Sequence, residues 1–89
     1  MRAMRIARLE FLVEPFVVNA PGQHVTAVID TVEAAGLAPD MGPFATTANG
    51  DLETVIVTVE KLLRSGFSNG ATSIQLRVEV NGPEVSNDG

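Results

Sequence analysis

The chain has 89 residues and a mass of 9.4 kDa, which leaves room for one domain with one hydrophobic core. Its 11 acidic and 6 basic residues give a net charge of −5, which disfavours a protein that follows nucleic-acid phosphates with a basic face. The absence of cysteine excludes disulfides, thiolate metal ligands and thiol nucleophiles. No apolar run approaches the roughly 20 residues that a membrane span needs. We therefore expect a small, acidic, cytoplasmic domain that binds neither nucleic acid nor a membrane.

The first expected strand covers residues 5–13, R-I-A-R-L-E-F-L-V, whose composition suits a half-buried pleated surface. Pro15 ends it, because proline has no N–H to donate to a sheet. Alternation places an apolar set on one face, namely Ala7, Leu9, Phe11 and Val13. The opposite face is mixed and carries Ile6, Arg8, Glu10, Leu12 and Glu14.

The first helix is expected to start in Asn19-Ala20-Pro21-Gly22, because a capping-type residue followed by proline is typical of a first turn. Its buried stripe is Val25, Val28, Ile29 and Val32, and Gly36 is a candidate left-handed cap at its end. His24, the one histidine, lies in the first turn. No nucleophile or orienting carboxylate frames it, so we interpret it as a surface or interface residue rather than a catalytic or metal-binding one.

The middle of the chain holds two prolines and little helical periodicity. We expect a short strand near 37–41, a turn at Gly42-Pro43 and a strand from about 44 to 48. Asn49-Gly50-Asp51 then opens a second helix that ends at Gly66. Its predicted buried stripe is Leu52, Val55, Ile56, Val59 and Leu63. Thr46 and Thr47 must point to opposite faces of their strand, and the residues alone fit either a structural strand or a ligand-binding edge.

Residues 71–80 alternate cleanly, with Ile74, Leu76, Val78 and Val80 facing inward and Ser73, Gln75, Arg77 and Glu79 facing outward. The element order is therefore β-α-β-β-α-β. Counted from Gly36 and Gly66, a weak internal repeat matches Ile29, Val32 and Leu37 with Val59, Leu62 and Phe67. We predict an α+β, ferredoxin-like domain over residues 1–81, with both helices on one face of an antiparallel sheet and a loose tail over 82–89. The uncovered sheet face favours self-association.

The chain resembles the small thiamine-binding protein family, the YkoF-like group of ferredoxin-like domains. The resemblance runs from about residue 6 to 80, and its most specific segment is G-P-F-A-T-T-A-N-G-D-L-E-T-V, which begins at Gly42. The first strand, the first helix and the closing S-G-F-S-N-G-A-T-S-I-Q-L also match. Two departures are Ala45, where many members have glycine, and E-P-F-V-V-N-A-P-G, which replaces a glycine- and serine-rich loop.

The resemblance implies non-catalytic binding of thiamine or its hydroxymethylpyrimidine part, in uptake, salvage or sequestration, by a homodimer or homotetramer. Thiamine is then a bound ligand, and no cofactor, metal or catalytic residue is expected. The ligand-binding residues that it implies are Glu10, Thr46, Phe44, Asn49 and Gln75. Glu10 and Thr46 are expected near one pocket, with a phenylalanine as an apolar or stacking wall. The alternative is an oligomeric structural or regulatory domain that has lost the ligand.

Overall fold

The computed structural model describes residues 5–15 and 22–80. The elements follow the predicted order: β1 (Ile6–Glu14), α1 (Gln23–Ala34), β2 (Asp40–Met41), β3 (Thr46–Asp51), α2 (Leu52–Ser68) and β4 (Ser73–Val80). The predicted helix start at residues 19–21, the domain boundary after residue 81 and the tail over 82–89 lie outside the described residues.

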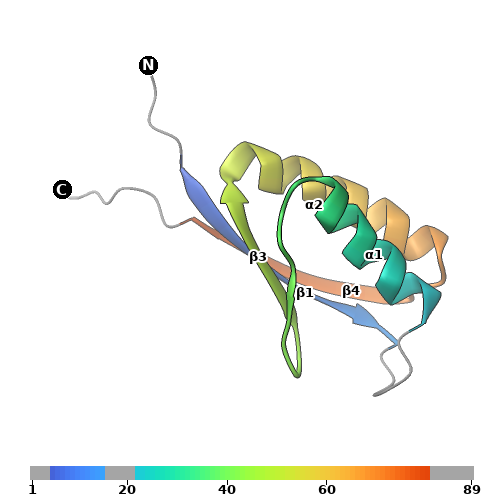
Figure 1. Ribbon diagram of the computed structural model, residues 1–89. Coiled ribbons are helices and arrows are strands. Elements are labelled where there is room, and N and C mark those ends of the chain that lie inside the picture. The colour runs from blue at the N-terminus through green and yellow to red at the C-terminus, as the bar shows by residue number, and fades with distance from the viewer. Residues whose placement is uncertain (1–4, 16–21, 81–89) are drawn as a thin grey trace.

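The four strands form one antiparallel sheet in the order β2-β3-β1-β4. Both helices lie against the same face of this sheet, as Figure 1 shows. This arrangement confirms the predicted ferredoxin-like α+β fold. The long strand β1 is central and pairs with β3 on one side and β4 on the other, so its side chains lie in the middle of both sheet faces.

The hydrophobic core forms between the sheet and the helices. It receives the predicted apolar face of β1 and the stripe of α1, in which Val28 and Val32 are fully buried. Pro15 directly follows β1, as predicted. Burying a side chain of the size of valine or leucine stabilises a fold by about 1.5–3 kcal/mol. The alternating apolar residues of β1 therefore fix which face of the sheet the helices cover.

The end of α1 was predicted correctly, whereas the end of α2 was not. Gly36 has a φ of +88° beyond α1, and the Leu37 N–H donates to the Val32 carbonyl at 3.3 Å, which closes the last turn. In α2 the equivalent glycine is Gly70, with a φ of +105°, because the helix continues to Ser68. Counting back from Gly66 therefore misaligned the internal repeat by one helical turn.

Gly66 lies inside α2 because the helix comes close to its neighbours there. A Cβ at this position would lie 3.1 Å from Val28 Cγ2 and 2.7 Å from Ile74 Cδ1. The buried stripe of α2 also differs from the predicted one. Ile56 is half exposed, and Thr58 is buried instead and donates to the Thr54 carbonyl at 2.7 Å. A buried threonine that satisfies its hydroxyl within the helix carries no hydrophobic signal in the sequence.

The β2–β3 hairpin is shifted relative to its prediction. β2 is only Asp40–Met41, and β3 runs on through Asn49-Gly50 to Asp51. Asp51 also caps α2, because its carboxylate accepts hydrogen bonds from the Thr54 N–H at 3.2 Å and the Thr54 hydroxyl at 2.6 Å. The strand therefore passes directly into the helix.

Candidate functional site

The sheet face opposite the helices, here called the open face, is covered by no helix within the described residues. At its centre the register places Arg8 opposite Glu79 and Glu10 opposite Arg77. Along the strands, Arg8 Nη1 lies 3.6 Å from Glu10 Oε1, and Arg77 Nη2 lies 3.6 Å from Glu79 Oε2. Each charge thus has opposite charges as neighbours both along and across the strands, so the four charges stabilise one another in the folded sheet.

A pocket of about 270 Å³ lies where β1 and β4 meet the tip of the β2–β3 hairpin. We call it the open-face pocket. Glu10 and Leu12 come from β1, and Gln75 and Arg77 come from β4, at positions that face away from the helices. The hairpin adds Phe44, whose side chain is 84% exposed. The complete lining is Glu10, Phe11, Leu12, Phe44, Ala45, Gln75, Leu76 and Arg77.

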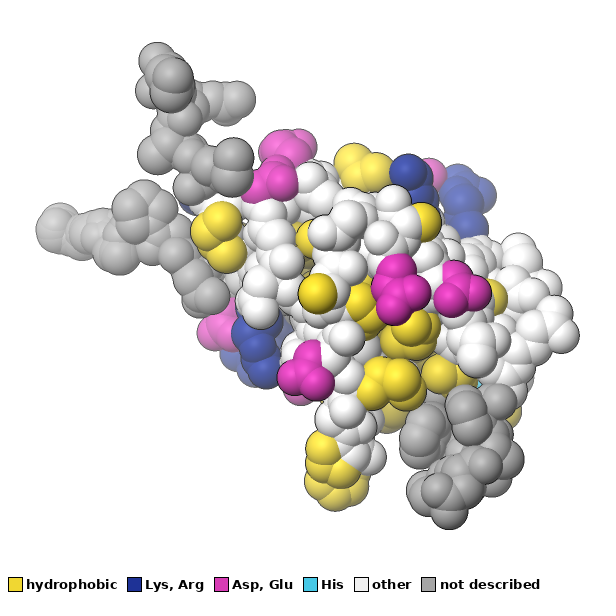
Figure 2. Space-filling view, viewed as in Figure 1, with side chains coloured by type: hydrophobic (Ala, Val, Ile, Leu, Met, Phe, Trp, Pro, Cys, Tyr) yellow, Lys and Arg dark blue, Asp and Glu magenta, His cyan; other side chains and the backbone are white. Residues whose placement is uncertain are grey.

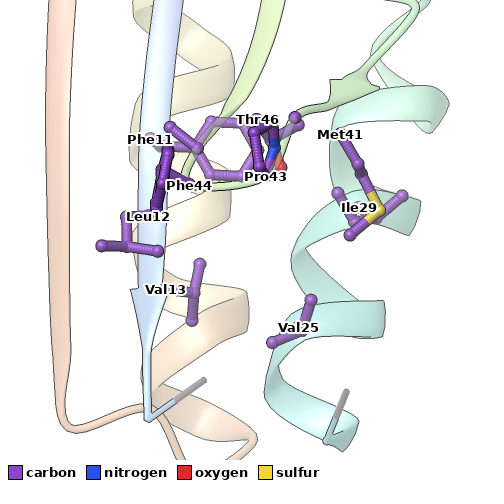
Figure 3. Close-up of a pocket in the computed structure, with 11 residues that line it drawn as sticks. Phe11, Leu12, Val13, Val25, Ile29, Met41, Pro43, Phe44 and Thr46 are labelled. Atoms are coloured by element: carbon purple, nitrogen blue, oxygen red, sulfur yellow. The ribbon is translucent and has the colours of Figure 1, made fainter. Parts of the chain in front are cut away.

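A second pocket lies on the helix side of the same hairpin, between β1 and α1. Figure 3 shows Met41 lying over Ile29 of α1, and Val13 of β1 pointing toward Val25. Its free volume is about 30 Å³, enough for a water molecule but too small for a heterocyclic ring. The hairpin tip, which carries hydrophobic side chains at the lower edge of Figure 2, borders both pockets.

The structure brings together Glu10, Phe44 and Gln75 of the predicted site residues, all in the lining of the open-face pocket. Thr46 is 8% exposed and lines the helix-side pocket, opposite Phe11 in the register. Asn49 is exposed on the open face beside Arg8, outside the pocket lining. The expectation that Glu10 and Thr46 share one pocket was therefore wrong, because the two residues point to opposite faces of the sheet.

The predicted ligand-binding residues left out two neighbours of Glu10. The register places Thr47, not Thr46, directly opposite Glu10 on β3, and Arg77 directly opposite it on β4. Arg77 was predicted to face away from the helices, and the face of Thr47 was left open. Which side chains become neighbours is decided by the pairing of distant strands. Alternation within one strand does not contain that pairing.

The chemistry of the open-face pocket suits a flat, polar ring. The Glu10 carboxylate accepts hydrogen bonds and attracts positive charge, and the Gln75 amide both donates and accepts. Arg77 adds further donors, and the exposed Phe44 ring offers a face for stacking. Within residues 5–15 and 22–80, no three His, Cys, Asp or Glu side chains lie close enough together to hold a metal ion.

His24 and Asp51 lie away from this pocket and have structural partners. His24 Nε2 forms a short contact with the Pro15 carbonyl, which connects the first turn of α1 with the end of β1. The hydrogen bonds from the Thr54 hydroxyl and N–H lower the pKa of Asp51. Both residues therefore support the ends of elements rather than the pocket.

The described residues form a small ferredoxin-like α+β domain with a polar pocket on the open face of its sheet. The sequence profile described as "Thiamine-binding protein" matches residues 9–83, and this chain belongs to that family. None of the curated proteins matches the chain. No helix of the described part is both long and apolar enough to cross a bilayer.

Solved structures from three bacteria have the same fold. A Streptococcus pneumoniae protein is 18% identical, with a TM-score of 0.67 over 90% of this chain and 89% of its own. A Thermotoga maritima protein, named as a candidate for thiamine biosynthesis or salvage, is 21% identical, with a TM-score of 0.63 over 84% of this chain and 81% of its own. A domain of unknown function from Bacillus cereus is 18% identical, with a TM-score of 0.63 over 88% of this chain and 76% of its own.

Proposed function

We propose that the protein binds thiamine or its hydroxymethylpyrimidine part without chemically changing it, in vitamin uptake, salvage or sequestration. Membership of the thiamine-binding family supports a thiamine-related role. The observation that carries the more specific proposal is the convergence of Glu10, Gln75 and Phe44 on one open pocket of about 270 Å³. These three side chains come from three separate elements, β1, β4 and the β2–β3 hairpin.

The chemistry of thiamine matches these groups. Its aminopyrimidine ring presents a donor beside an acceptor, which an amide such as that of Gln75 complements. Its thiazolium is a cation, which the Glu10 carboxylate attracts. Phe44 stacks on the flat pyrimidine or lies against the cationic ring. The acidic overall charge of −5 also favours a cationic ligand over an anionic one.

The proposal includes a homodimer or homotetramer in which a second subunit lies beside the open-face pocket. The open-face pocket is bordered by β4, the outermost strand on its side of the described sheet, so a subunit next to β4 would lie beside the pocket. Ligand pockets typically bury most of a ligand's surface. A pocket open on one side therefore gains affinity when a neighbouring subunit closes it.

Thermal unfolding with thiamine, hydroxymethylpyrimidine and an unrelated organic cation tests this function. A ligand at about 100 times its dissociation constant stabilises the folded state by roughly 2.7 kcal/mol. For a domain of this size, each kcal/mol raises the unfolding midpoint by about 4–8 °C. We expect thiamine and hydroxymethylpyrimidine to raise the midpoint and the unrelated cation to leave it unchanged.

Two outcomes would contradict the proposal. Equal midpoints with and without a large excess of either ligand would favour the alternative function, an oligomeric structural or regulatory domain without a ligand. Conversion of thiamine by the purified protein, followed by mass spectrometry of the recovered vitamin, would contradict its non-catalytic part. Recovery of unchanged thiamine together with a midpoint shift is the expected result.

A further inference from the structure

The outer edge of β4 has the features of a surface that pairs with another strand. Within residues 5–15 and 22–80, β4 has a neighbouring strand, β1, on one side only. An edge of this kind presents backbone N–H and C=O groups that can extend the sheet. Val78 and Val80 are 37% and 41% exposed, although the register places them on the same face as the buried Leu9 and Ala7.

These valines are exposed because of where the helices end. Figure 1 shows the beginning of β1 and the end of β4 extending beyond the helices. The apolar side of β4 therefore continues past the core that α1 and α2 cover. Both valines lie on the edge strand, and they gain free energy when a second apolar surface covers them.

The charges on the other side of β4 are self-complementary. Arg77 and Glu79 lie two positions apart on the open face and flank Val78. If β4 pairs antiparallel with its own copy about a two-fold axis at Val78, Arg77 lies opposite the partner subunit's Glu79. By symmetry, Glu79 then lies opposite the partner subunit's Arg77. The same register places Val78 opposite its symmetry mate and Leu76 opposite the partner subunit's Val80.

Other registers lose this complementarity. A shift of one residue places the apolar side of one strand beside the polar side of the other. An axis at Arg77 or at Glu79 places two like charges opposite each other, which destabilises the pair. An axis at Leu76 places Arg77 opposite the partner subunit's Gln75, so the charges on the two strands do not pair.

We propose that β4 pairs antiparallel with β4 of a second copy of this chain, in the register centred on Val78. The two sheets then form one continuous sheet, and the alternating charges of the open face continue across the subunit boundary. Arg77, which lines the open-face pocket, would have the partner subunit's Glu79 as its neighbour on the outer side. The open-face pockets of both subunits would then lie next to the shared boundary.

Two single charge reversals test the pairing, with the oligomeric state measured by analytical ultracentrifugation without ligand. In Arg77→Glu, each mutated residue faces the partner subunit's Glu79, and in Glu79→Arg each faces the partner subunit's Arg77. We expect the dissociation constant of this contact to rise about tenfold or more in each variant, because two like-charge contacts replace two opposite-charge ones. Mixing the two variants pairs Glu with Arg at both positions and should restore the contact in a heterodimer.

Arg64→Glu is the matched control, because Arg64 also forms an ion pair, at 3.1 Å from Glu60, but lies on α2. Far-ultraviolet circular dichroism checks that each variant is folded. Any loss of stability within a variant subunit is the same in the separate variants and in their mixture, so the mixture differs only in the contact between subunits. The proposal is supported if association is weaker in both variants than in the wild type, is restored when the variants are mixed, and is unchanged in the control. A monomeric wild type, or variants that associate as the wild type does, would overturn it. Because the measurement uses no ligand, its outcome is independent of thiamine binding.

Discussion

Glu10 occupies the centre of the open face, between Thr47 on β3 and Arg77 on β4. Its carboxylate lies 3.6 Å from Arg8 and lines the open-face pocket, so we expect it to be the acceptor for a cationic or amino-bearing ligand. Glu10 combines negative charge with a place in a pocket that also holds an aromatic ring, that of Phe44. Its substitution therefore tests the chemistry of the site at the scale of one residue.

Glu10→Gln is expected to weaken thiamine binding while the fold is retained, because glutamine keeps the shape of the side chain but loses its charge. A hydrogen bond to a charged group contributes about 1–1.5 kcal/mol more than a neutral one, which corresponds to a rise of roughly 5- to 13-fold in the dissociation constant. Isothermal titration calorimetry measures the change. Glu14→Gln is the control, since Glu14 shares the strand and the face but does not line the pocket. Equal affinities in the two variants would place the site elsewhere.

Phe44→Ala is expected to weaken binding without lowering the stability of the free protein. The Phe44 side chain is 84% exposed, so the fold gains little from it, whereas stacking on a base contributes about 1–3 kcal/mol. Calorimetry and thermal unfolding of the same variant separate the two effects. Phe67→Ala, at a half-exposed position on α2, is the matched control and should leave affinity unchanged. Full affinity of Phe44→Ala would show that the Phe44 ring does not contact the ligand.

At the scale of the elements, the cap of α2 makes stability depend on pH. The hydrogen bonds from Thr54 lower the pKa of Asp51 in the folded state. The unfolded chain therefore binds a proton more readily than the folded one in acid. The contribution of the Asp51 cap to the free energy of unfolding is complete above the pKa of Asp51 in the unfolded chain, about 3.9. The contribution is lost as the pH falls through the lower pKa that Asp51 has in the folded protein.

Asp51→Asn is expected to flatten the acid side of the stability curve, because asparagine still caps a helix but does not titrate. The wild type should be the more stable protein at neutral pH, and the difference should shrink as the pH falls below about 4. Thr54→Val, which removes the hydroxyl donor, should also make the stability depend less on pH. Unfolding midpoints measured over a pH series check this, and a difference that stays constant with pH would contradict it.

Gly36→Ala is expected to destabilise the fold by about 1 kcal/mol, because alanine is strained at the φ of +88° that ends α1. Nothing lies within 4 Å of the added Cβ, so the loss comes from backbone strain rather than from a clash. Gly36→Asn should lose less, since asparagine tolerates this conformation better. Chemical denaturation measures both, and equal stabilities of Gly36→Ala and wild type would contradict the role of Gly36.

At the scale of the whole molecule, the element order predicted the ferredoxin-like fold, whereas the register between distant strands and the close packing of helix on helix could not be predicted. The alternation of β1 and β4 predicted the element type and the face of each side chain correctly. The register that places Thr47 and Arg77 beside Glu10 comes from pairing between distant strands. Gly66 was predicted to end the helix because glycine is common at helix ends. The structure instead requires glycine there because the helix packs closely against Val28 and Ile74, a tertiary contact that the local sequence does not show.

The candidate site follows the same division. Glu10, Phe44 and Gln75 were identified by resemblance, and the structure brings them into one pocket. Thr46 was separated from them because its side of β3 faces the helices, which depends on where β3 begins and how it pairs with β1. The hairpin directly follows Pro39, contains Pro43 and begins with a two-residue strand, so it gives no clear alternation from which to read that side.

The most direct test of the central claim is a titration of the ¹⁵N-labelled protein with hydroxymethylpyrimidine, followed by two-dimensional NMR. Binding in the open-face pocket should shift the amide signals of Glu10, Leu12, Ala45 and Gln75 in a saturable manner. The signals of Thr54, Val57 and Lys61, in α2 on the other side of the sheet, should stay unchanged. An unperturbed spectrum at saturating ligand, or shifts confined to the helices, would contradict the assignment of this protein as a thiamine binder that uses its open sheet face.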